Sequence, residues 1–484
     1  MNACATIDDK VSVAGIDAIA STTKLWADLI KEGNEHPEAK CSVTFANGAT
    51  ETFSLHDSFR KRERRLKGKC IDLEAAYRQC PVKKAHSFCA IFGLKNPETG
   101  EAEFFEAAAL PFGAAAAVHG FNRAAAALRA ILHEVTGVPC SNYFDDFTIV
   151  GPDEVIDDLD EIVHEVLAAF GWATAVEKED PKGPGEEFAA LGVEFDLRQA
   201  LANTDPKIVV RKQAEQDRRT LRDHRRHLAK QRMSPHEARE LRGRLVVSNS
   251  QAFGKLGATA FFELTRKAES PQGRDELGGS LKSALTWWKD HVARAKPRAI
   301  KVGPQRRPLL LFTDGSCEPD RESKWNVRAG FGAVLYDPED DSLRAFGGYL
   351  GDKILGDITK RGAKKQVVGQ AELYPGVLAK EVWGDAMRGR NVLHFVDNEA
   401  AKYGLIKGSS PTEDCAWLIQ EYWSRECEAE SHTWIERVPS ASNCADPPSR
   451  CSWSILEQGG RPCNRVSLPT EFEENLLRAK HRRV

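Results

Sequence analysis

Two adjacent carboxylates near residue 145 have the residue types and the setting of a metal site. The tetrapeptide Tyr143-Phe144-Asp145-Asp146 lies between the apolar runs Val138–Cys140 and Phe147–Val150. This pattern predicts a tight β-hairpin with both carboxylates near its turn. Adjacent carboxylates repel and are costly to bury, and a divalent cation such as Mg²⁺, which prefers hard oxygen ligands, removes that cost. A solvated acidic turn is the alternative interpretation of the tetrapeptide by itself.

A third carboxylate upstream strengthens the metal interpretation. Lys69–Asp72 predicts a short strand that delivers Asp72 to its end, with Tyr77 five residues further on. Two paired strands are then predicted, over Ser87–Leu94 and Glu103–Ala108. Next, Leu110–Gly113 breaks the pattern and opens an alanine-rich helix that runs to about His133. Small residues after Gly113 let another chain or a ligand approach the backbone, although tight packing explains them equally well.

A second set of acids lies in the C-terminal half. Asp314 ends a predicted buried strand that starts near Pro308, and Glu372 is in the first turn of a helix predicted from Gln370 to about Met387. Asp397 ends another buried strand, and Asp446 precedes Pro447, a residue suited to the first turn of a helix. Each acid taken separately could equally be a strand-end or helix cap.

Composition describes a multidomain protein without a membrane span. The chain has 484 residues, 41% hydrophobic and 29% charged, and no apolar run approaches the ~20 residues of a membrane helix. The first twenty residues contain Asp8, Asp9 and Asp17 and lack the form of a secretory signal. Twelve cysteines without a CxxC pair indicate reduced thiols in a cytoplasmic or nuclear protein.

The net charge of −3 argues neither for nor against a nucleic-acid partner, but the charge distribution does. Phe59–Lys69 reads FRKRERRLKGK, and Lys and Arg outnumber Asp and Glu between Arg211 and Arg244. Such basic stretches neutralise phosphates and give salt-dependent binding. A solvated helix face with paired charges is the alternative.

In their order, these pieces resemble the polymerase domain of reverse transcriptases from retroelements, over roughly residues 60–200. The strings that carry the resemblance are DLEAAYRQ (Asp72–Gln79), LPFGAAAAVHGFNR (Leu110–Arg123), YFDD (Tyr143–Asp146), Gly171-Trp172 with Lys178, and LGVEF (Leu191–Phe195). The segment from Ser234-Pro235 to Phe253-Gly254 resembles the thumb of the long-terminal-repeat or tyrosine-recombinase retrotransposon branch.

The resemblance implies a site residue by residue. Asp72 and Asp145 would bridge two Mg²⁺ ions, with Mn²⁺ as a substitute, and Asp146 would support them. Tyr77 matches the gate that excludes a ribose 2′-hydroxyl, although a core aromatic is the alternative. Gln79 and the Phe112-Gly113 turn would flank the nascent base pair. Lys178 is a candidate general acid toward pyrophosphate, and an exposed lysine is the alternative. Arg60, Lys61 and Arg62 could contact the triphosphate from the fingers, although this segment departs from the finger pattern of the family.

The C-terminal acids resemble those of type-1 ribonuclease H. TDGS (Thr313–Ser316), AEL (Ala371–Leu373), VDN (Val396–Asn398) and NCADPPSR (Asn443–Arg450) follow the order of that family. The resemblance implies that two metal ions are bound by Asp314, Glu372, Asp397 and Asp446. The loop before Asp446 lacks the histidine of many cellular members, and no basic substrate-binding helix is apparent between Gly404 and Cys415.

The expected fold class is therefore α/β and α+β, with a right-hand polymerase of fingers, palm and thumb followed by a ribonuclease H-like α/β domain. The expected divisions are an N-terminal region with partial fingers (1–70), palm and fingers (71–200), thumb (201–268), connection (269–306), ribonuclease H-like domain (307–455) and an uninformative tail (456–484).

The expected function is copying of an RNA template from a DNA primer with dNTPs, followed by cleavage of the RNA in the RNA–DNA hybrid. Other products of a polyprotein are further candidate partners. Two alternatives remain open: a degenerate or domesticated retroelement protein that binds nucleic acid without catalysis, and an unrelated metal-dependent nuclease.

Overall fold

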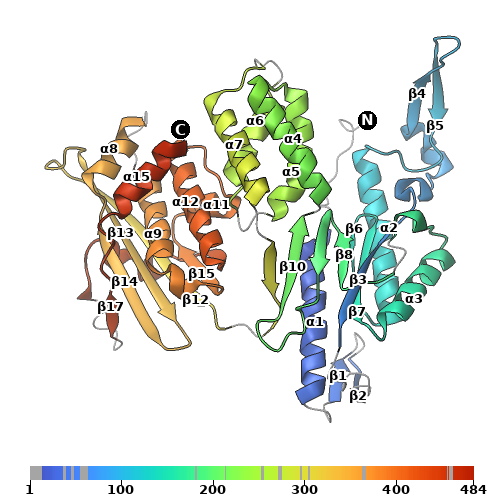
Figure 1. The fold of residues 1–484 in the computed structure, drawn as a ribbon, viewed down its shortest axis with the longest axis horizontal. Helices are drawn as coiled ribbons and strands as arrows, with labels where there is room; N and C mark the ends of the chain where they lie inside the picture. The colour runs from blue at the N-terminus through green and yellow to red at the C-terminus, as the bar shows by residue number, and fades with distance from the viewer. Residues whose placement is uncertain are drawn as a thin grey trace. The chain divides into compact units, whose positions relative to one another are not determined.

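The computed structural model forms two compact units, and each is described by itself (Figure 1). Unit 1 comprises Met1–Gln213 and Pro297–Gly303, and unit 2 comprises Ala214–Lys296 and Pro304–Val484. The structure describes residues 13–35, 40–44, 48–54, 64–179, 183–212, 214–251, 255–270, 275–294, 297–303, 306–361, 367–454, 456 and 462–483. The expected triphosphate contacts at 60–62 lie outside these residues. Within them, no helix combines the length and the hydropathy needed to cross a bilayer.

A three-stranded antiparallel sheet of order β3-β7-β6 is the centre of unit 1. Its strands are β3 (Leu66–Asp72), β6 (Cys140–Tyr143) and β7 (Asp146–Pro152). Phe147 and Ile149 of β7 are buried in a core that includes residues of α2 (Ala115–Thr136) and α3 (Ile156–Ala169). Helix α1 (Ile16–Glu35) contacts the same strand, and Trp26 donates a 2.7 Å hydrogen bond to the carbonyl of Val150. Because β7 is covered by these helices, its apolar run is continuous rather than alternating.

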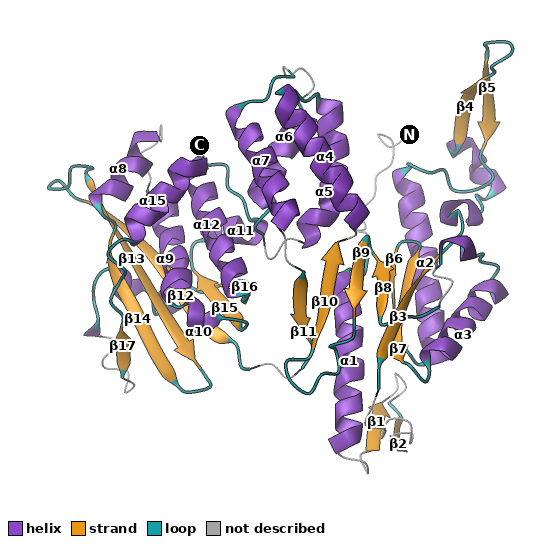
Figure 2. Cartoon of the chain, in the orientation of Figure 1, coloured by secondary structure: helices purple, strands orange, loops and turns teal. Residues whose placement is uncertain are grey.

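Unit 1 contains two further hairpins, of which the second was expected from the sequence. Strands β1 (Lys40–Thr44) and β2 (Thr50–Ser54) pair antiparallel, as do β4 (Ile91–Lys95) and β5 (Ala102–Glu106). The first expected strand is shorter than Ser87–Leu94, because Lys84–Cys89 forms a 3₁₀ turn. In Figure 2 the β4–β5 hairpin extends away from the rest of unit 1, and every residue of both strands is exposed.

A four-stranded sheet of order β11-β10-β9-β8 completes unit 1. It contains β8 (Glu187–Ala190), β9 (Val193–Asp196), β10 (Lys207–Lys212) and β11 (Arg298–Lys301). The chain therefore returns to unit 1 after the helices that follow β10. Strand β10 pairs within this sheet although it lies in the segment expected to begin the thumb (201–268), and β11 lies in the segment expected to be the connection (269–306). Pairing between residues this far apart in the chain leaves no local signal in the sequence.

A group of helices begins unit 2: α4 (Ala214–Lys230), α5 (Pro235–Gln251), α6 (Ala258–Ala268) and α7 (Gly279–Arg294). Helix α5 starts with a capping box, in which Ser234 and Glu237 each receive a backbone N–H of the other. Trp288 of α7 is fully buried with Leu241, Leu264 and Leu285. Helix α7, within the segment expected to be the connection (269–306), thus supplies the largest side chain of this core.

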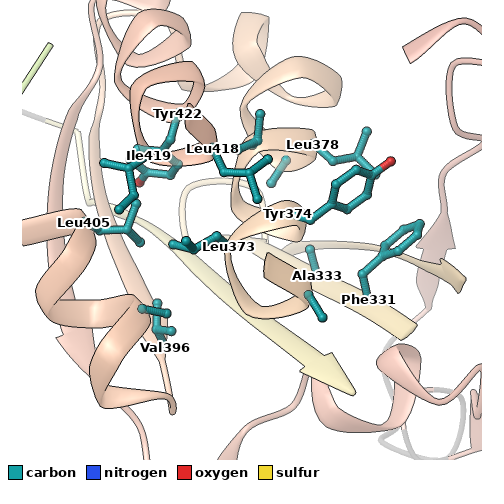
Figure 3. Packing of buried hydrophobic residues seen from close by; sticks show 14 of the residues in the cluster. Phe331, Ala333, Leu373, Tyr374, Leu378, Val396, Leu405, Leu418, Ile419 and Tyr422 are labelled. Carbon is teal, nitrogen blue, oxygen red and sulfur yellow. The ribbon is translucent and has the colours of Figure 1, made fainter. Parts of the chain in front are cut away.

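The second part of unit 2 is a six-stranded sheet of order β16-β15-β12-β13-β14-β17. Strands β12 (Leu309–Pro319), β13 (Val327–Asp337) and β14 (Ser342–Tyr349) form an antiparallel meander, while β15 (Asn391–Val396) and β16 (His432–Arg437) continue parallel to β12. Helices α9 (Val368–Val382), α11 (Glu399–Lys407) and α12 (Glu413–Ala429) pack together beside the sheet. Figure 3 shows the core between them, where Leu373, Leu378 and Tyr422 face Ala333 and Val396.

The C-terminal residues are part of this unit and not an appended tail. Strand β17 (Cys463–Arg465) pairs parallel with β14, and helix α15 (Phe472–Arg483) buries Phe472 and Leu476 in the core. Lys480 of α15 is 4% exposed and donates to Asp414 at 2.6 Å and also to Asp357. These contacts lie beyond residue 455, the expected end of the ribonuclease H-like domain. The segment has few apolar residues, and the partners of Lys480 lie far from it in the chain, so the sequence pattern did not indicate its packing.

Helix α9 approaches β12 at Gly315 more closely than any side chain would allow. A Cβ placed on Gly315 would lie 2.4 Å from backbone atoms of Ala371 and Glu372. Real Cβ atoms essentially never come within 3.0 Å of such neighbours, so this glycine sets the separation of helix and sheet.

We expect Gly315→Ala to lower the free energy of unfolding by about 1–3 kcal/mol, because α9 would have to move away from β12. Thermal or chemical denaturation of the full chain measures this. Gly384→Ala is the matched control, since a Cβ there meets no atom within 4 Å. Equal stability of the two variants would contradict the close-packing argument.

Candidate metal centres

Backbone pairing brings three carboxylates together in unit 1. Asp72 ends β3 and pairs directly with Asp146, the first residue of β7. Residues opposite each other on antiparallel strands project to the same face. Asp145 lies in the turn between β6 and β7, and one carboxylate oxygen from each of the three residues lies within 4.8 Å of the others. The structure thus brings together the three aspartates that the sequence singled out.

The proximity of these carboxylates changes their acidity. Burial, and then the charges of Asp145 and Asp72, raise the pKa of Asp146 to about 6. Burial also raises the pKa of Asp145, and the neighbouring Asp72 adds to this. Phe144, in the same turn, has a φ of 53°, a backbone conformation that costs energy for a bulky residue. Strained residues of this kind occur where the surrounding structure fixes them, often at functional sites.

Lys178 provides a positive charge to this group. It ends the 3₁₀ turn Val176–Lys178, and its Nζ donates to Oδ2 of Asp72. The amide of Ala175 donates to the carbonyl of Asp72 at 2.8 Å, so the same segment is tied to the end of β3 by its backbone. The side chain of Lys178 is 61% exposed, and it can leave Asp72 without opening a buried space.

A neighbouring ion network holds the segment that carries Lys178. Glu179 is almost buried, and Lys69 Nζ lies 2.6 Å from Glu179 and 2.7 Å from Asp160. His164 lies 3.0 Å from Glu179, and hydrogen bonding to Asp160 raises the pKa of His164 to about 9. The oxygens of Asp160 and Glu179 and a nitrogen of His164 also fall within metal-ligand reach of one another. Two cations already balance the two carboxylates, so this group is a structural ion network rather than a metal site. No sequence motif indicated this network, because Lys69 and Glu179 are far apart in the chain.

Of the residues expected to contact substrate, Tyr77 and Phe112 line one cavity. The Tyr77 ring stacks on Phe121 with centroids 4.8 Å apart, and its centroid is 5.7 Å from that of Phe112. A cavity of about 1070 Å³ is lined by both rings and by Phe92, Phe144 and Asp145. Phe112 is 90% exposed, and Gly113 has a φ of 87° with open space where a Cβ would be. This turn is thus accessible, as expected from its small residues.

Gln79 differs from the expectation. Its side-chain nitrogen donates to the carbonyls of Glu74 and Ala173, and its oxygen accepts the amide of Ala173 at 2.7 Å. The amide group is therefore used to join two backbone segments. A contact between Gln79 and a nascent base pair stays a prediction, and it would require these bonds to be exchanged.

Three of the four C-terminal acids gather in unit 2. Thr313 of β12 pairs with Val396 of β15, so Asp314 and Asp397 are the next residues on neighbouring strands. Helix α9 adds Glu372, whose Oε2 accepts the amide of Gly315 at 3.2 Å. One oxygen from each acid lies within 4.8 Å of the others. Asp314 lies inside β12 rather than at its end, where the sequence predicted it, because the strand continues to Pro319.

Asp446, the fourth expected acid, is not among the three whose oxygens meet within 4.8 Å, but its charge contributes to the raised pKa of Asp314. It is the first residue of the short helix α13 (Asp446–Ser449), and its carboxylate accepts Nε of Arg450 at 3.2 Å. Two further residues of the NCADPPSR string contact Asp314 directly. Asn443 and Ser449 both donate hydrogen bonds to the Asp314 carboxylate.

Burial and repulsion act more strongly on this second group. Burial, and then the charges of Asp314 and Asp397, raise the pKa of Glu372 to about 8. Burial, opposed by the hydrogen bond from Ser449 but aided by Asp397, raises the pKa of Asp314 to about 6. Oδ1 of Asp397 is buried without a hydrogen-bond partner. A buried, unpartnered carboxylate oxygen facing two other acids fits a hard divalent cation.

We expect metal binding by unit 2 to release protons at neutral pH. Without metal, Glu372 is protonated at pH 7, and ligation requires its charged form. Isothermal titration calorimetry with Mg²⁺ in two buffers of different ionisation enthalpy should give different heats for the parent chain. Glu372→Gln should remove most of that difference, and equal heats in both buffers for the parent would contradict the assignment.

The same shift predicts a pH dependence of stability. Because the folded protein keeps a proton on Glu372 between its ordinary pKa and about 8, while the unfolded chain loses it, the metal-free free energy of unfolding should fall with rising pH in that window. Added Mg²⁺ should therefore raise the melting temperature more at the upper end of the window than at the lower end. Thermal melts of the parent and of Glu372→Gln measure this.

Comparison with known proteins gives weak likenesses only. No protein family profile and no curated protein matches the sequence. One similar solved structure is that of the foamy viral protease-reverse transcriptase in complex with RNA/DNA hybrid, with 12% identity over 80% of this chain and 67% of that chain and a TM-score of 0.26. Another is RNase H1 from the halophilic archaeon Halobacterium salinarum NRC-1, with 18% identity over 31% of this chain and 99% of that chain and a TM-score of 0.22. Function has to be inferred from the side chains described above.

Proposed function

We propose that this chain is a retroelement-type RNA-directed DNA polymerase that also cleaves the RNA strand of RNA–DNA hybrids. The observation that carries the proposal is the convergence of Asp72, Asp145 and Asp146 at the end of a hairpin, beside the cavity lined by Tyr77. The proposed substrates are an RNA template, a DNA primer and dNTPs. A separate acidic group in unit 2 supports the second activity.

In the polymerase site, Asp72, Asp145 and Asp146 are the residues that would hold Mg²⁺. The bound ions would supply positive charge to the triphosphate and activate the primer 3′-hydroxyl. Lys178, which neutralises Asp72 in this structure, is exposed enough to turn toward a phosphate of the incoming nucleotide. The backbone pairing of β3 and β7 keeps Asp72 and Asp146 in place while Lys178 moves.

The Tyr77 cavity is proposed to receive the sugar and base of the nucleotide. Tyr77 is held by its stack on Phe121, which is fully buried and cannot move aside. Burial, aided by Asp145, raises the pKa of Tyr77, so its hydroxyl stays neutral beside the carboxylates. A fixed ring at this position limits the room for a 2′-hydroxyl, and Phe112 offers an exposed aromatic face for a base.

In unit 2, the residues that would hold Mg²⁺ are Asp314, Glu372 and Asp397. Their positions depend on β12, β15 and the close approach of α9 at Gly315. The bound ions would activate water and stabilise the departing 3′-oxygen of RNA. The chain's own part is to hold three acids together against their repulsion and to lose the proton of Glu372 on ligation.

Single substitutions in the two acidic groups should separate the two proposed activities. On an RNA template with a DNA primer and Mg²⁺, Asp145→Asn should reduce extension at least ~100-fold, since it removes a charge needed in the transition state, while leaving hybrid cleavage unchanged. Glu372→Gln should do the reverse. Primer extension and cleavage of a labelled hybrid, each with metal present or chelated, measure the two effects.

Asp158→Asn, on the exposed face of α3, is the control for loss of one carboxylate outside the site. Parent-like extension by Asp145→Asn would show that this group is not the polymerase site. An inactive parent that still binds hybrid would favour the non-catalytic, nucleic-acid-binding alternative.

Tyr77 gives a test of nucleotide selection. Tyr77→Ala should increase ribonucleotide incorporation roughly tenfold, because the ring that limits space for the 2′-hydroxyl is lost. Tyr77→Phe keeps the ring and its stack on Phe121 and should discriminate as the parent does. Steady-state incorporation of matched dNTP and NTP pairs measures the ratio, and equal ratios in Tyr77→Ala and the parent would reject the gate.

A further inference from the structure

The turn that follows β16 packs against the sheet through the backbone atoms of the turn. This turn, Asn443–Arg450, includes α13, and Asn443, Ala445 and Ser449 in it are at most 4% exposed. It lies on a floor of glycines in β13 and β14. A Cβ on Gly330 would lie 2.0 Å from the carbonyl oxygen of Ser449, and one on Gly332 would lie 2.4 Å from the Ser449 nitrogen.

Gly347 completes this glycine floor, defined as Gly330, Gly332 and Gly347. A Cβ on Gly347 would lie 2.2 Å from the carbonyl oxygen of Pro448. All these distances are to backbone atoms, which cannot rotate away as a flexible side chain can. Ser316 of β12 adds a buried 2.8 Å hydrogen bond to the carbonyl of Ser449. The turn is therefore held against β13 and β14 by backbone contacts and against β12 by the Ser316 hydrogen bond.

Two side chains of the seated turn reach the Asp314 carboxylate. Ser449 Oγ lies 2.6 Å from Oδ2 of Asp314 and 2.8 Å from the carbonyl oxygen of Asp446, and its single proton is directed to the nearer carboxylate oxygen; Asn443 Nδ2 lies 3.3 Å from Oδ1. Asn443 Nδ2 also donates to the carbonyl of Thr313 at 3.1 Å, while its oxygen accepts the amide of Ala445 at 3.2 Å. Because both ends of the amide are used, the nitrogen must face β12. Each oxygen of Asp314 thus has one neutral donor on the side of the turn.

With one hydrogen bond accepted on each oxygen, Asp314 keeps its remaining lone pairs available to a ligand on the side where Glu372 and Asp397 lie. A carboxylate with a hydrogen bond on each oxygen cannot turn about its terminal torsion without losing one of them, and both donors are buried. Because both donors are neutral, they do not neutralise the negative charge of the Asp314 carboxylate, as a pairing with lysine or arginine would. Ligands ordered in this way by neighbouring hydrogen bonds bind metal more tightly.

We propose that Ser449 and Asn443 are positioning residues that hold the Asp314 carboxylate in its metal-binding orientation. The inference rests on the proposed role of Asp314, Glu372 and Asp397 as a metal site. It assigns to the Asn443–Arg450 turn a function that does not depend on Asp446, whose carboxylate pairs with Arg450 instead.

The test measures metal affinity directly. The full chain with Asp72→Asn, which weakens the other acidic group, is titrated with Mn²⁺ by calorimetry at neutral pH. Ser449→Ala should weaken binding at the Asp314 group by about 10–100-fold, the usual effect of losing a hydrogen bond to a metal ligand. Asn443→Ala should weaken it less, because its bond is longer and is shared with Thr313.

Ser316→Ala is the matched control. It removes a buried hydrogen bond to the same turn but no contact with Asp314, so it should lower the melting temperature while leaving Mn²⁺ affinity unchanged. Equal affinity of Ser449→Ala and the parent, or equal losses in Ser449→Ala and Ser316→Ala, would overturn the inference. If Ser449→Ala does not fold, Ser449→Cys, with a similar size and a weaker donor, serves in the same comparison.

Glu372→Gln in the same background separates this inference from the proposed function. If Glu372→Gln leaves Mn²⁺ binding unchanged, the proposed metal site itself is wrong. If Glu372→Gln abolishes binding and Ser449→Ala does not weaken it, the metal site stands and the positioning role alone is wrong.

Discussion

Repulsion between carboxylates is the constraint on which both candidate centres depend. Like charges within ligand distance of one another destabilise a fold unless the backbone leaves them no alternative. In unit 1 the pairing of Asp72 with Asp146 across β3 and β7 imposes the contact. In unit 2 the parallel pairing of β12 and β15 places Asp314 beside Asp397, and the packing of α9 adds Glu372. Ladder hydrogen bonds and buried apolar side chains on those strands offset the electrostatic cost.

The two units relieve the same repulsion by different means. Unit 1 uses a cation: Lys178 pairs with Asp72 on a segment anchored by the ion network of Lys69 and Glu179. Unit 2 uses a proton and neutral donors, since Glu372 is uncharged at neutral pH and the hydroxyl of Ser449 bonds to Asp314. The difference follows burial: Lys178 in the first site is exposed and can exchange with a ligand, whereas Asp314 and Glu372 in the second site are buried.

Local patterns predicted the parts of the fold that depend on neighbours in sequence. The hairpin around Asp145, the alanine-rich helix after Gly113 and the helix carrying Glu372 are all set by periodicity and turn residues. Contacts between distant residues left no signal in the sequence. Gln79 is bound by the backbone of Ala173, and Trp288 is buried by helices before it in the chain.

Glycine explains why the second centre was only partly predictable. Gly315 admits the backbone of α9, and Gly330, Gly332 and Gly347 admit the turn that carries Asn443 and Ser449. In each case a strand glycine, which has no side chain, lets another backbone segment come close enough to position the acid. Strand propensity scores glycine only as unfavourable for a strand, so it does not indicate this role. The glycines lie on opposite faces of the sheet: α9 packs at Gly315 and α13 at the other three. The Asp314 group is therefore clamped between two elements whose distances from the sheet are both set by backbone contact. A site built in this way tolerates little change in its surroundings, because no flexible side chain is available to absorb a displacement.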